Sequence, residues 1–451
     1  MRLGMVRGAV TGPGRRALLR GAGGLGLGLL TAPALAACGT ADAAPVRSGK
    51  VGISVWTHDP GYIKTFETAV KDSALMRGSP FDFRIRSTST APSDVVTRMV
   101  AQAVADGNTP DLAGIVVDQF SRVMGSSIAE NLFVDLTETI RPLGDDLLKL
   151  APYVVDGIAY GLDSDNSITV LYYRQDVFDK YHVPEDVGTW EELAEHGERL
   201  HSDHNISLGM VSTGDNVSVV NGFLQLLLQR GGGFFDPTGE LVLDSPEAVE
   251  VLEFMSRGVR TGVLLALPDP YGSACAAALK SGRLAATAMP NWYNAYGLQA
   301  NVPDQKGRWR MRTLPRFAGG GHLASTLGGT AFTVLKDKPN TDAALELLRR
   351  VYLSREGQIL RYRSGGFLPT LKPLYQDPEL LGVKDEFLGG QRVFDVYSRA
   401  AADLPLFYQA PGMQILIDVL GGPVLDALKG RTSPAAAIKA GLAAYRQQVK
   451  R

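Results

Sequence analysis

The chain has 451 residues, 45% of them hydrophobic, and its 46 lysines and arginines nearly balance its 47 aspartates and glutamates. A chain of this length predicts two or three domain-sized units with a substantial core. Without the five arginines before residue 38, 41 basic and 47 acidic residues remain, and this net charge of −6 argues against nucleic acid or an anionic membrane face as a partner.

The first 37 residues have the pattern of an export signal. Their charged residues are all arginines, and no acidic residue occurs before Asp42. The run from Gly21 to Ala37 is uncharged, and it ends in the small residues that precede a cleavage site. It is short and glycine-rich for a membrane span. The pair Arg15-Arg16 resembles the twin-arginine export signal, and the general secretory route is the alternative.

Leu35-Ala36-Ala37-Cys38 resembles the lipobox of bacterial lipoproteins. In that class the cysteine receives diacylglycerol and becomes the first residue of the mature chain, so we expect lipid on the Cys38 thiol. Residues 38–49 would then be a lipidated cysteine followed by a flexible tether. The alternative is a plain secretory signal with an incidental cysteine. With Cys38 acylated, no disulfide can form within the chain, and Cys275 is expected to be a buried, small apolar residue.

Four runs have the pattern of β-strands, at residues 50–56, 81–86, 111–117 and 168–173. The third is continuously apolar, as is typical of buried parallel strands. In open α/β sheets, ligands bind beyond the carboxyl ends of the strands. This rule makes candidates of Trp56, His58 and Asp59 at the end of the first strand, and of Asp118 and Gln119 after the third.

Helices are expected between and after these strands. Ser93 or Asp94 is the predicted N-cap of one helix and Thr189 that of another, while further helices are predicted to begin at Pro246 and at Thr341. Thr189 forms a capping-box pattern with Glu192, and Pro246 occupies the first helical position of its segment. The alternation of strands and helices predicts an α/β sheet with crossover helices.

A series of segments then resembles one known family in order and spacing. The segments are Ala101–Asp111, Asn131–Leu136, Asp156–Gly161, Leu171–Phe178, Thr189–Leu193, Leu279–Ala286, Asn291-Trp292, Leu327–Thr330, Ser354–Gln358 and Gly366–Pro369. Together they resemble the extracellular solute-binding proteins of ABC importers, in the carbohydrate-binding group. The resemblance covers nearly all of the chain after the signal.

This resemblance implies an α/β, type II periplasmic-binding-protein fold, in which two discontinuous lobes enclose a ligand cleft. We expect residues 50–160 with 310–365 in the first lobe, and residues 161–309 with 366–451 in the second. A ligand held by both lobes would close the hinge. The closed form would be recognised by the ABC permease subunits with their ATPase.

The resemblance also implies where the protein works. We expect a monomer in an extracytoplasmic position, anchored to the outer face of the bacterial cell membrane by the lipid on Cys38. Its expected ligand is a sugar, either a disaccharide or an oligosaccharide.

A sugar has an apolar face of C–H groups and a rim of hydroxyls, so its site needs an aromatic platform and polar side chains. Trp292 occupies the position of the family's interlobe tryptophan, and we predict that it is the platform, with Trp56 as a second candidate. The polar candidates are Asp118, Gln119, His58, Asp59, Asp165, Asn166, Asp215, Asn294 and Arg363. Gly328 and Gly329 would let backbone amides approach the ligand closely.

Several of these candidates have a structural alternative. Trp56 would serve equally as core packing, Asp118 as a helix N-cap, and Arg363 as half of a surface ion pair. Asp165 and Asn166 would fit an ordinary turn. Of the other tryptophans, Trp190 is expected to pack structurally, and Trp309 to lie in a strand at a lobe surface.

Other chemistries have less support in the sequence. Tyr172 and Tyr173 would face opposite sides of a strand, which disfavours an iron site. The histidines at 196, 201 and 204 have no cysteine partner for zinc. Because nucleophile-elbow and phosphate-loop motifs are absent from the sequence, we expect no enzyme, metal or cofactor. A non-sugar polar solute such as a glycerophosphodiester, and a secreted carbohydrate-active hydrolase with paired carboxylates, stay open as alternatives.

Overall fold

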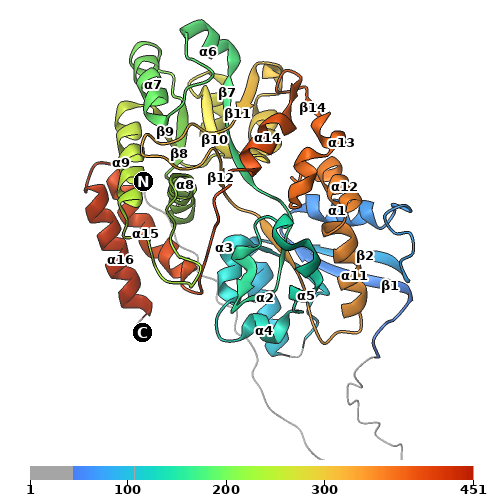
Figure 1. Ribbon diagram of the computed structural model, residues 1–451. Coiled ribbons are helices and arrows are strands. Elements are labelled where there is room, and N and C mark those ends of the chain that lie inside the picture. The colour runs from blue at the N-terminus through green and yellow to red at the C-terminus, as the bar shows by residue number, and fades with distance from the viewer. Residues whose placement is uncertain (1–43, 106, 450–451) are drawn as a thin grey trace, which may run out of the picture. The chain divides into compact units, whose positions relative to one another are not determined.

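Two β-sheets organise residues 44–105 and 107–449, the residues that the computed structural model describes (Figure 1). Each sheet forms the centre of one lobe. The predicted export signal, Cys38 and residues 38–43 of the predicted tether lie outside the described residues. Within the described residues, no helix combines the length and the apolar character needed to cross a bilayer.

The first sheet has the strand order β2-β1-β3-β13-β6. Its strands are β1 (Gly49–Thr57), β2 (Phe81–Ser89), β3 (Leu112–Val116), β6 (Leu162–Asp163) and β13 (Thr330–Val334). β1 pairs in parallel with β2 and β3, whereas β13 pairs antiparallel with β3 and β6. The first three predicted strands are therefore confirmed, and β3 is buried, as its apolar run predicts.

Two distant parts of the chain supply the helices of the first lobe, which are α1 (Pro60–Ala69), α2 (Pro92–Val104), α3 (Val117–Phe120), α4 (Ile128–Leu132), α5 (Thr137–Ile140), α11 (Thr341–Tyr352) and α12 (Arg355–Gly365). Helices α1, α2, α3 and α11 pack on the strands of the sheet, and α12 packs against α1 and α11. The predicted cap of α2 at Ser93 or Asp94 is wrong. Ala91 is the N-cap residue, because Pro92 takes the helical φ of the first position and starts the helix earlier.

The second sheet is built around β7 (Ile168–Arg174), which confirms the fourth predicted strand. Antiparallel partners of β7 are β10 (Ala286–Pro290), β11 (Trp309–Arg312) and β12 (Ser325–Thr326). The smaller strand pairs are β4 (Val154–Val155) with β5 (Ile158–Ala159), β8 (Gly209–Ser212) with β9 (Leu264–Leu267), and β14 (Lys384–Asp385) with β15 (Gln391–Arg392). The predicted surface position of Trp309 is wrong. Its side chain is fully buried, and its indole N–H donates to Gln305 Oε1 at 2.9 Å.

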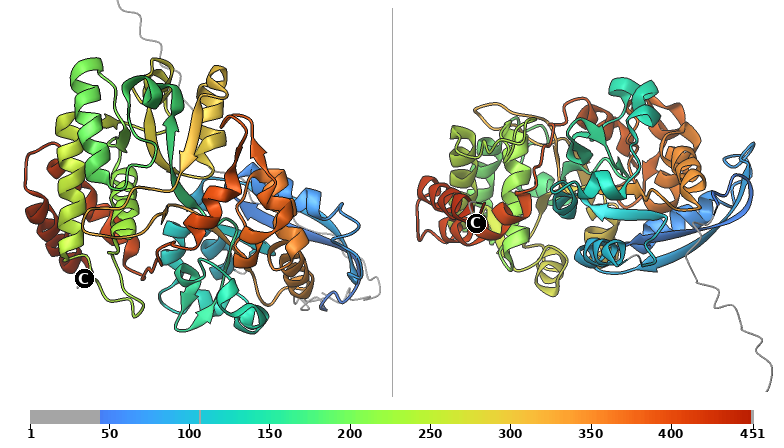
Figure 2. Two further views of the ribbon diagram at one scale, coloured as in Figure 1. Left: turned by 45° about the horizontal axis from the view of Figure 1, so that its top comes forward. Right: turned by 90° about the horizontal axis from the view of Figure 1, so that it is seen from below.

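Helices surround the second sheet, and α15 and α16 lie side by side against α9 (Figure 2). The helices are α6 (Gln175–Tyr181), α7 (Trp190–His204), α8 (Asn216–Arg230), α9 (Pro246–Thr261), α10 (Ser273–Lys280), α13 (Pro378–Leu381), α14 (Val393–Ala401), α15 (Met413–Leu428) and α16 (Pro434–Val449). The predicted starts at Thr189 and Pro246, and that of α11 at Thr341, are confirmed. Both bonds of the Thr189–Glu192 capping box are present.

The chain crosses between the two main sheets at residues 164–167, which join β6 to β7, and at residues 327–329, which join β12 to β13. A third crossing, at residues 366–371, leads from α12 to the helices α13 and α14 of the second lobe. The return to the first lobe was expected at residue 310. However, β11 and β12 both pair with β7, so residues 310–326 belong with the second sheet. Gly328 and Gly329 both adopt positive φ, which allows the sharp turn of the second crossing.

The end of the predicted tether belongs to the folded lobe. The backbone N–H of Val46 donates to Pro339 O at 2.8 Å, and Arg47 forms an ion pair with Asp342. β1 then begins at Gly49. Val46 and Arg47 are therefore held at the start of α11, so the last residues of the predicted tether are part of the folded lobe.

Candidate ligand site

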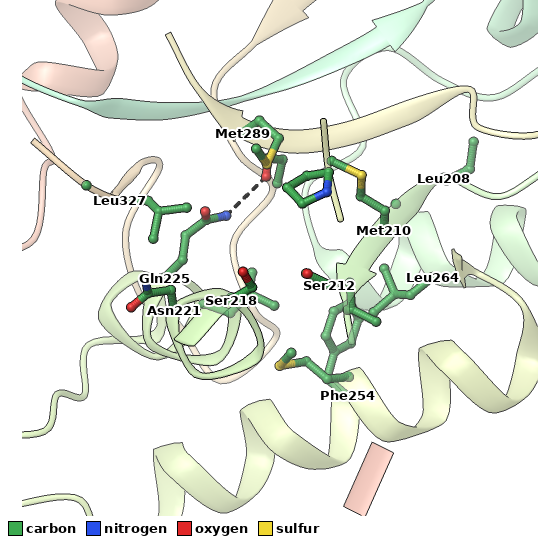
Figure 3. Close-up of a pocket in the computed structure, with 18 of the residues that line it drawn as sticks. Leu208, Met210, Ser212, Ser218, Asn221, Gln225, Phe254, Leu264, Met289 and Leu327 are labelled. Atoms are coloured by element: carbon green, nitrogen blue, oxygen red, sulfur yellow. Dashed lines mark hydrogen bonds between the residues drawn. The ribbon is translucent and has the colours of Figure 1, made fainter. Parts of the chain in front are cut away.

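A cavity of about 270 Å³ opens in the second lobe, between α8, the β8–β9 pair and the end of β10 (Figure 3). Trp292 and Gly328, two of the predicted ligand residues, line it. Leu327 and Gly328 reach it from a crossing segment, so the cavity lies where the second lobe meets the connection to the first. Ligand sites in α/β proteins are typically concave, mostly apolar and located at such junctions.

Trp292 follows β10 directly after Asn291 and is partly buried at this cavity. Its ring centroid lies 5.8 Å from that of Tyr271, at an interplanar angle of 35°. Tyr271 also lines the cavity and is 43% exposed. The two rings together make an aromatic surface that solvent reaches from one side, as the platform prediction requires.

A row of α8 residues that was not predicted from the sequence faces the cavity. Ser218, Asn221, Gly222 and Gln225 all line it. Their spacing of three, four and seven residues places them on one face of the helix. The other faces of α8 carry mainly buried apolar residues. A polar stripe at helical spacing inside an otherwise apolar helix was the signal that could have identified this row.

Two of the polar groups at the cavity are anchored by hydrogen bonds. Gln225 Nε2 donates to Ala288 O at 3.1 Å, and Ser212 Oγ donates to Pro268 O at 3.1 Å. In these two bonds both side chains act as donors, so the Gln225 side-chain oxygen and the lone pairs of the Ser212 hydroxyl can still accept hydrogen bonds. Anchored polar groups lose little entropy when a ligand binds, so they suit the recognition of hydroxyls.

Asp215 and Asn294 lie close to the cavity in sequence but are used locally. Asp215 is the N-cap residue of α8, and Ser218 N donates to its Oδ1 at 2.8 Å. Asn294 is buried after Trp292, and its Nδ2 donates to Asp385 Oδ2 at 2.6 Å. Neither residue lines the cavity. Their predicted contacts with a ligand stay predictions.

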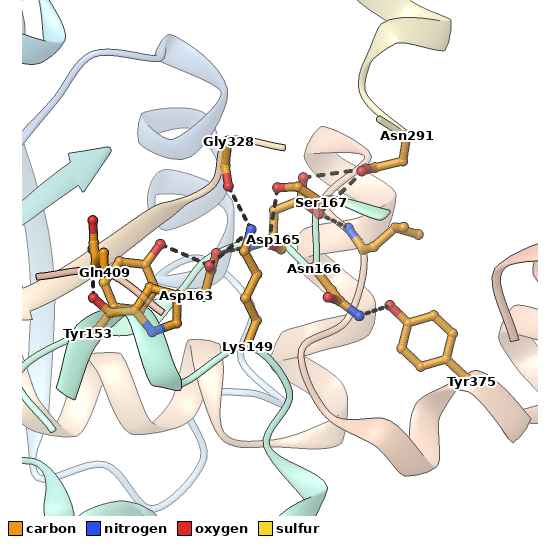
Figure 4. A network of polar contacts seen from close by, with 12 residues as sticks. Lys149, Tyr153, Asp163, Asp165, Asn166, Ser167, Asn291, Gly328, Tyr375 and Gln409 are labelled. Carbon is orange, nitrogen blue, oxygen red and sulfur yellow. Dashed lines mark hydrogen bonds and ion pairs between the residues drawn. The ribbon is translucent and has the colours of Figure 1, made fainter. Parts of the chain in front are cut away.

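Asp165 and Asn166 lie in the first crossing segment, where buried polar groups form a network (Figure 4). Leu368 N donates to Asp165 Oδ1 at 2.7 Å, and Asn291 Nδ2 lies 3.4 Å from both carboxylate oxygens. Asn166 Nδ2 donates to the Tyr375 hydroxyl at 3.0 Å. Both side chains therefore tie the first crossing to residues from other parts of the second lobe.

A buried ion pair joins the same crossing to the second one. Lys149 Nζ lies 3.4 Å from Asp163 Oδ2 and donates to Gly328 O at 2.7 Å. The Tyr153 hydroxyl also donates to Asp163 Oδ2, at 2.9 Å, and Asp165 N donates to Asp163 Oδ1. The cation thus holds the two crossings together at the edge of the cavity.

The buried carboxylates of this network have altered acidity. Burial raises the pKa of Asp165 to about 7, with Lys149 opposing the rise and Asp163 adding to it. Burial also raises the pKa of Asp163, again opposed by Lys149. Arg361, fully buried on α12, is a further cation that lowers the pKa of Asp165. Asp165 therefore gains or loses its proton near neutral pH. We call the buried polar groups around it, which link the crossing segments, the crossing network.

The first-lobe candidates gather at the ends of β1 and β3. Trp56 is a core residue, 8% exposed, with the Arg98 guanidinium 5.1 Å from its ring centroid. Asp59 caps α1 by accepting from Gly61 N at 2.7 Å. Burial lowers the pKa of His58. Burial raises the pKa of Tyr296 in the second lobe, and the Asp59 carboxylate adds to the rise, so this edge faces the other lobe.

Asp118 and Gln119 lie in the first turn of α3, directly after β3. The N-cap residue is Val116, so the alternative of Asp118 as a cap is wrong. Burial raises the pKa of Asp118. Gln119 Nε2 lies 3.4 Å from Gln414 Oε1 of α15, which is a contact between the lobes. These two residues have the position expected of the first-lobe side of a cleft, although they do not line the cavity of Figure 3.

Gly329 and Arg363 differ in their surroundings. A Cβ on Gly329 would come within 2.4 Å of Lys149 Nζ, so this glycine is required by the crossing network. Arg363 forms an ion pair with Glu379 at 2.6 Å and is largely exposed. Arg363 therefore takes the structural alternative, a surface ion pair.

Among the described residues, no cluster of three or more histidine, cysteine, aspartate or glutamate side chains is placed to hold a metal ion. Tyr172 and Tyr173 are both buried. Cys275 is free and fully buried, as predicted, with its sulfur 3.3 Å from the Tyr293 hydroxyl.

Known proteins match this chain over most of its length. The family model of bacterial extracellular solute-binding proteins matches residues 62–385. An arabinooligosaccharide-binding protein of Bacillus subtilis is 27% identical over 414 residues, covering 88% of this chain and 92% of the relative. A lactose-binding protein of Rhizobium radiobacter is 28% identical over 368 residues, covering 78% and 82%.

Solved structures agree on the fold. The galacto-N-biose-/lacto-N-biose I-binding protein of an ABC transporter from Bifidobacterium longum superposes with a TM-score of 0.70 at 18% identity, covering 90% of this chain and 98% of its own. The predicted α/β, two-lobe fold of type II is therefore confirmed. The chain belongs to the family of bacterial extracellular solute-binding proteins.

Proposed function

We propose that this chain is the substrate-binding component of an ABC importer and captures a disaccharide or oligosaccharide at the cavity beside Trp292. The observation that carries the proposal is the pairing of an aromatic surface, Trp292 with Tyr271, and a polar helix face, Ser218 to Gln225. A sugar ring presents the matching surfaces, an apolar face and a rim of hydroxyls. The relatives named for arabinooligosaccharide and lactose binding support the same class of ligand.

The position of the cavity supports a role in hinge closure. Gly328 lines the cavity and is bonded through its carbonyl to Lys149, which belongs to the crossing network. A ligand that contacts both lobes stabilises the closed arrangement by its differential affinity for it. On the first-lobe side, Asp118, Gln119, His58 and Asp59 are proposed to complete the site. The closed form would then deliver the sugar to the permease.

A thermal-shift and calorimetric screen tests the ligand class. The purified protein is titrated with arabino-oligosaccharides of two to four units, lactose, lacto-N-biose and maltose, with glycerophosphocholine as the non-sugar solute. We expect stabilisation by at least one saccharide, because a ligand that binds only the folded state raises its stability. Stabilisation by glycerophosphocholine alone would refute the sugar assignment, and release of shorter saccharides would indicate a hydrolase.

Trp292→Ala is the decisive variant. Removal of a central aromatic contact typically costs at least about 2 kcal/mol, or roughly 30-fold in Kd. Tyr181→Ala is the control, because Tyr181 is a partly buried aromatic of the same lobe that does not line the cavity. An unchanged Kd in Trp292→Ala would remove this residue from the site.

Anchoring through Cys38 belongs to the same proposal, with the protein at the outer face of the membrane. The apolar run before Cys38 and its small-residue end support it. In cells of a bacterial host, we expect the full chain in the membrane fraction, with diacylglycerol on Cys38 by mass spectrometry. Cys38→Ala should move it to the soluble extracytoplasmic fraction. An unmodified Cys38 in a mature, exported protein would contradict the anchor and leave the ligand proposal unaffected.

A further inference from the structure

The cavity beside Trp292 has two chemically different parts. Its polar wall consists of Ser212, Ser218, Asn221 and Gln225, and its apolar floor consists of Trp190, Leu208, Phe254, Met255 and Leu264. Figure 3 shows the α8 side chains of the polar wall on one side, and Leu208, Leu264 and Phe254 on the other. The floor residues are buried, except for Phe254, which is partly buried. In the polar wall, Gln225 is buried, whereas Ser212, Ser218 and Asn221 remain partly exposed. Most of the floor is therefore more buried than most of the polar wall.

The side chains of the apolar floor carry one hydrogen-bonding group, the indole N–H of Trp190, and this group is already used within the protein. The Trp190 indole N–H donates to Gln229 Oε1 at 2.8 Å. A hydroxylated ring placed there would lose its bonds to water and gain none from the protein. The floor thus favours an apolar group.

The size and the flexibility of the cavity suit an aromatic ring. An apolar cavity of about 150 Å³ is enough to hold benzene, and the whole cavity, which the floor shares with the polar wall, measures about 270 Å³. Met210, Met255 and Met289 all line it. Methionine side chains adapt to the shape of a bound group, and their sulfur atoms make favourable contacts with aromatic rings.

We propose that the apolar floor binds an aryl substituent of the ligand, so that the preferred substrate class is an aryl glycoside whose saccharide lies against Trp292 and the polar wall. This inference rests on the proposed sugar-binding function for the saccharide half. The floor itself is defined independently of it, by the burial and the chemistry of its residues. A saccharide without such a substituent would leave the floor empty and bind more weakly.

Gly222 offers a direct way to fill the cavity. It lies on α8 among the residues of the polar wall and lines the cavity, and a Cβ added to it would meet no atom within 4 Å. Gly222→Leu therefore places its Cβ in open space and directs the rest of the side chain into the cavity region, and leucine also favours the helix over glycine. Gly422→Leu is the matched control. Gly422 lies inside α15, likewise has open space at its Cβ, and is not part of the cavity.

The experiment compares methyl and 4-nitrophenyl glycosides of α-L-arabinofuranose and of β-D-galactose by calorimetry. Free 4-nitrophenol is the sugar-free probe. In the unaltered protein and in Gly422→Leu, we expect the 4-nitrophenyl member of a pair to bind at least about 10-fold more tightly than the methyl member. In Gly222→Leu this advantage should fall below about 2-fold. Equal affinities within each pair in the unaltered protein, or an advantage that survives Gly222→Leu, would overturn the proposal.

Failure of the proposed function gives a different pattern. If no glycoside or oligosaccharide binds, the sugar assignment fails, and free 4-nitrophenol alone decides the floor. Binding of 4-nitrophenol that Gly222→Leu abolishes supports the floor as an apolar site, and no binding of this probe overturns it. If oligosaccharides bind while the aryl advantage is absent, the sugar assignment stands and the apolar floor is refuted.

Discussion

Replacement of Lys149 by methionine tests whether the buried cation holds the crossing segments together. The side chains of Lys149 and Asp163 are 3% and 0% exposed, and the lysine ammonium also donates to Gly328 O at 2.7 Å. In Lys149→Met the Asp163 carboxylate keeps the Tyr153 hydroxyl and a backbone N–H, but no cation. Breaking a buried pair in this way typically costs about 3–5 kcal/mol. For a lobe of 150–250 residues, about 3 kcal/mol lowers Tm by roughly 6–12 °C.

The pH dependence of this loss has a defined sign. Burial raises the pKa of Asp163 and Lys149 lowers it, so removal of the lysine raises it further. The folded variant then binds a proton at a higher pH than the unfolded chain does. Its stability relative to the unaltered protein should therefore recover as pH falls and Asp163 becomes neutral.

Thermal and urea denaturation at pH 7.5 and pH 5 measure both effects. Asp163→Asn combined with Lys149→Met should recover much of the stability, because it removes the unpaired charge. Arg257→Met is the control. The Arg257–Glu198 pair is 59% and 33% exposed, and loss of such a surface pair costs at most about 1 kcal/mol. A loss below about 1 kcal/mol in Lys149→Met, or a double variant no more stable than the single one, would refute this reasoning.

Three further predictions concern single side chains. The pKa of about 7 at Asp165 means that the folded protein binds a proton that the unfolded chain releases near pH 4, so stability falls as pH rises from about 4 to 7. Asp165→Asn keeps an oxygen for Leu368 N and should flatten Tm over that range; an unchanged slope would argue against Asp165 as the titrating group. Thr189→Ala removes the capping bond to Glu192 N and should cost about 1 kcal/mol in urea denaturation, while a cost near zero would mean that the cap is dispensable. Cys275 is fully buried and burial raises its pKa, so a thiol reagent should label it only after unfolding; rapid labelling of the native protein would contradict its placement.

Much of the local structure could be predicted from the sequence because its causes are local. Alternating and continuous apolar runs gave the correct positions of β1, β2, β3 and β7. Thr189 and Glu192 satisfy each other's backbone groups within one helical turn, so their capping box needs no distant partner. The order of short segments was enough for the family, and with it for the two-lobe fold.

The errors in the prediction come from partners far away in the chain. The run at β11 alternates like any strand, and nothing local shows that it pairs with β7 rather than with the first sheet. For the same reason, Trp309 was expected at a surface although it is fully buried. The lobe boundary was therefore set too early, at residue 310 instead of at the crossing around Gly328.

The features of the candidate site also fall into two groups, those with local causes and those that depend on distant partners. The sequence by itself determined the export-signal pattern before Cys38, the family and, through the family's motifs, Trp292 as the platform candidate, because each depends on the order of neighbouring residues. Only the tertiary structure decided that Asp165 and Asn166 turn inward to bond the chain itself, and that Ser218, Asn221 and Gln225 face an apolar floor built from α7, α9 and the β8–β9 pair. A cavity is enclosed by side chains from separate elements, so its shape and its polarity exist only once those elements have packed.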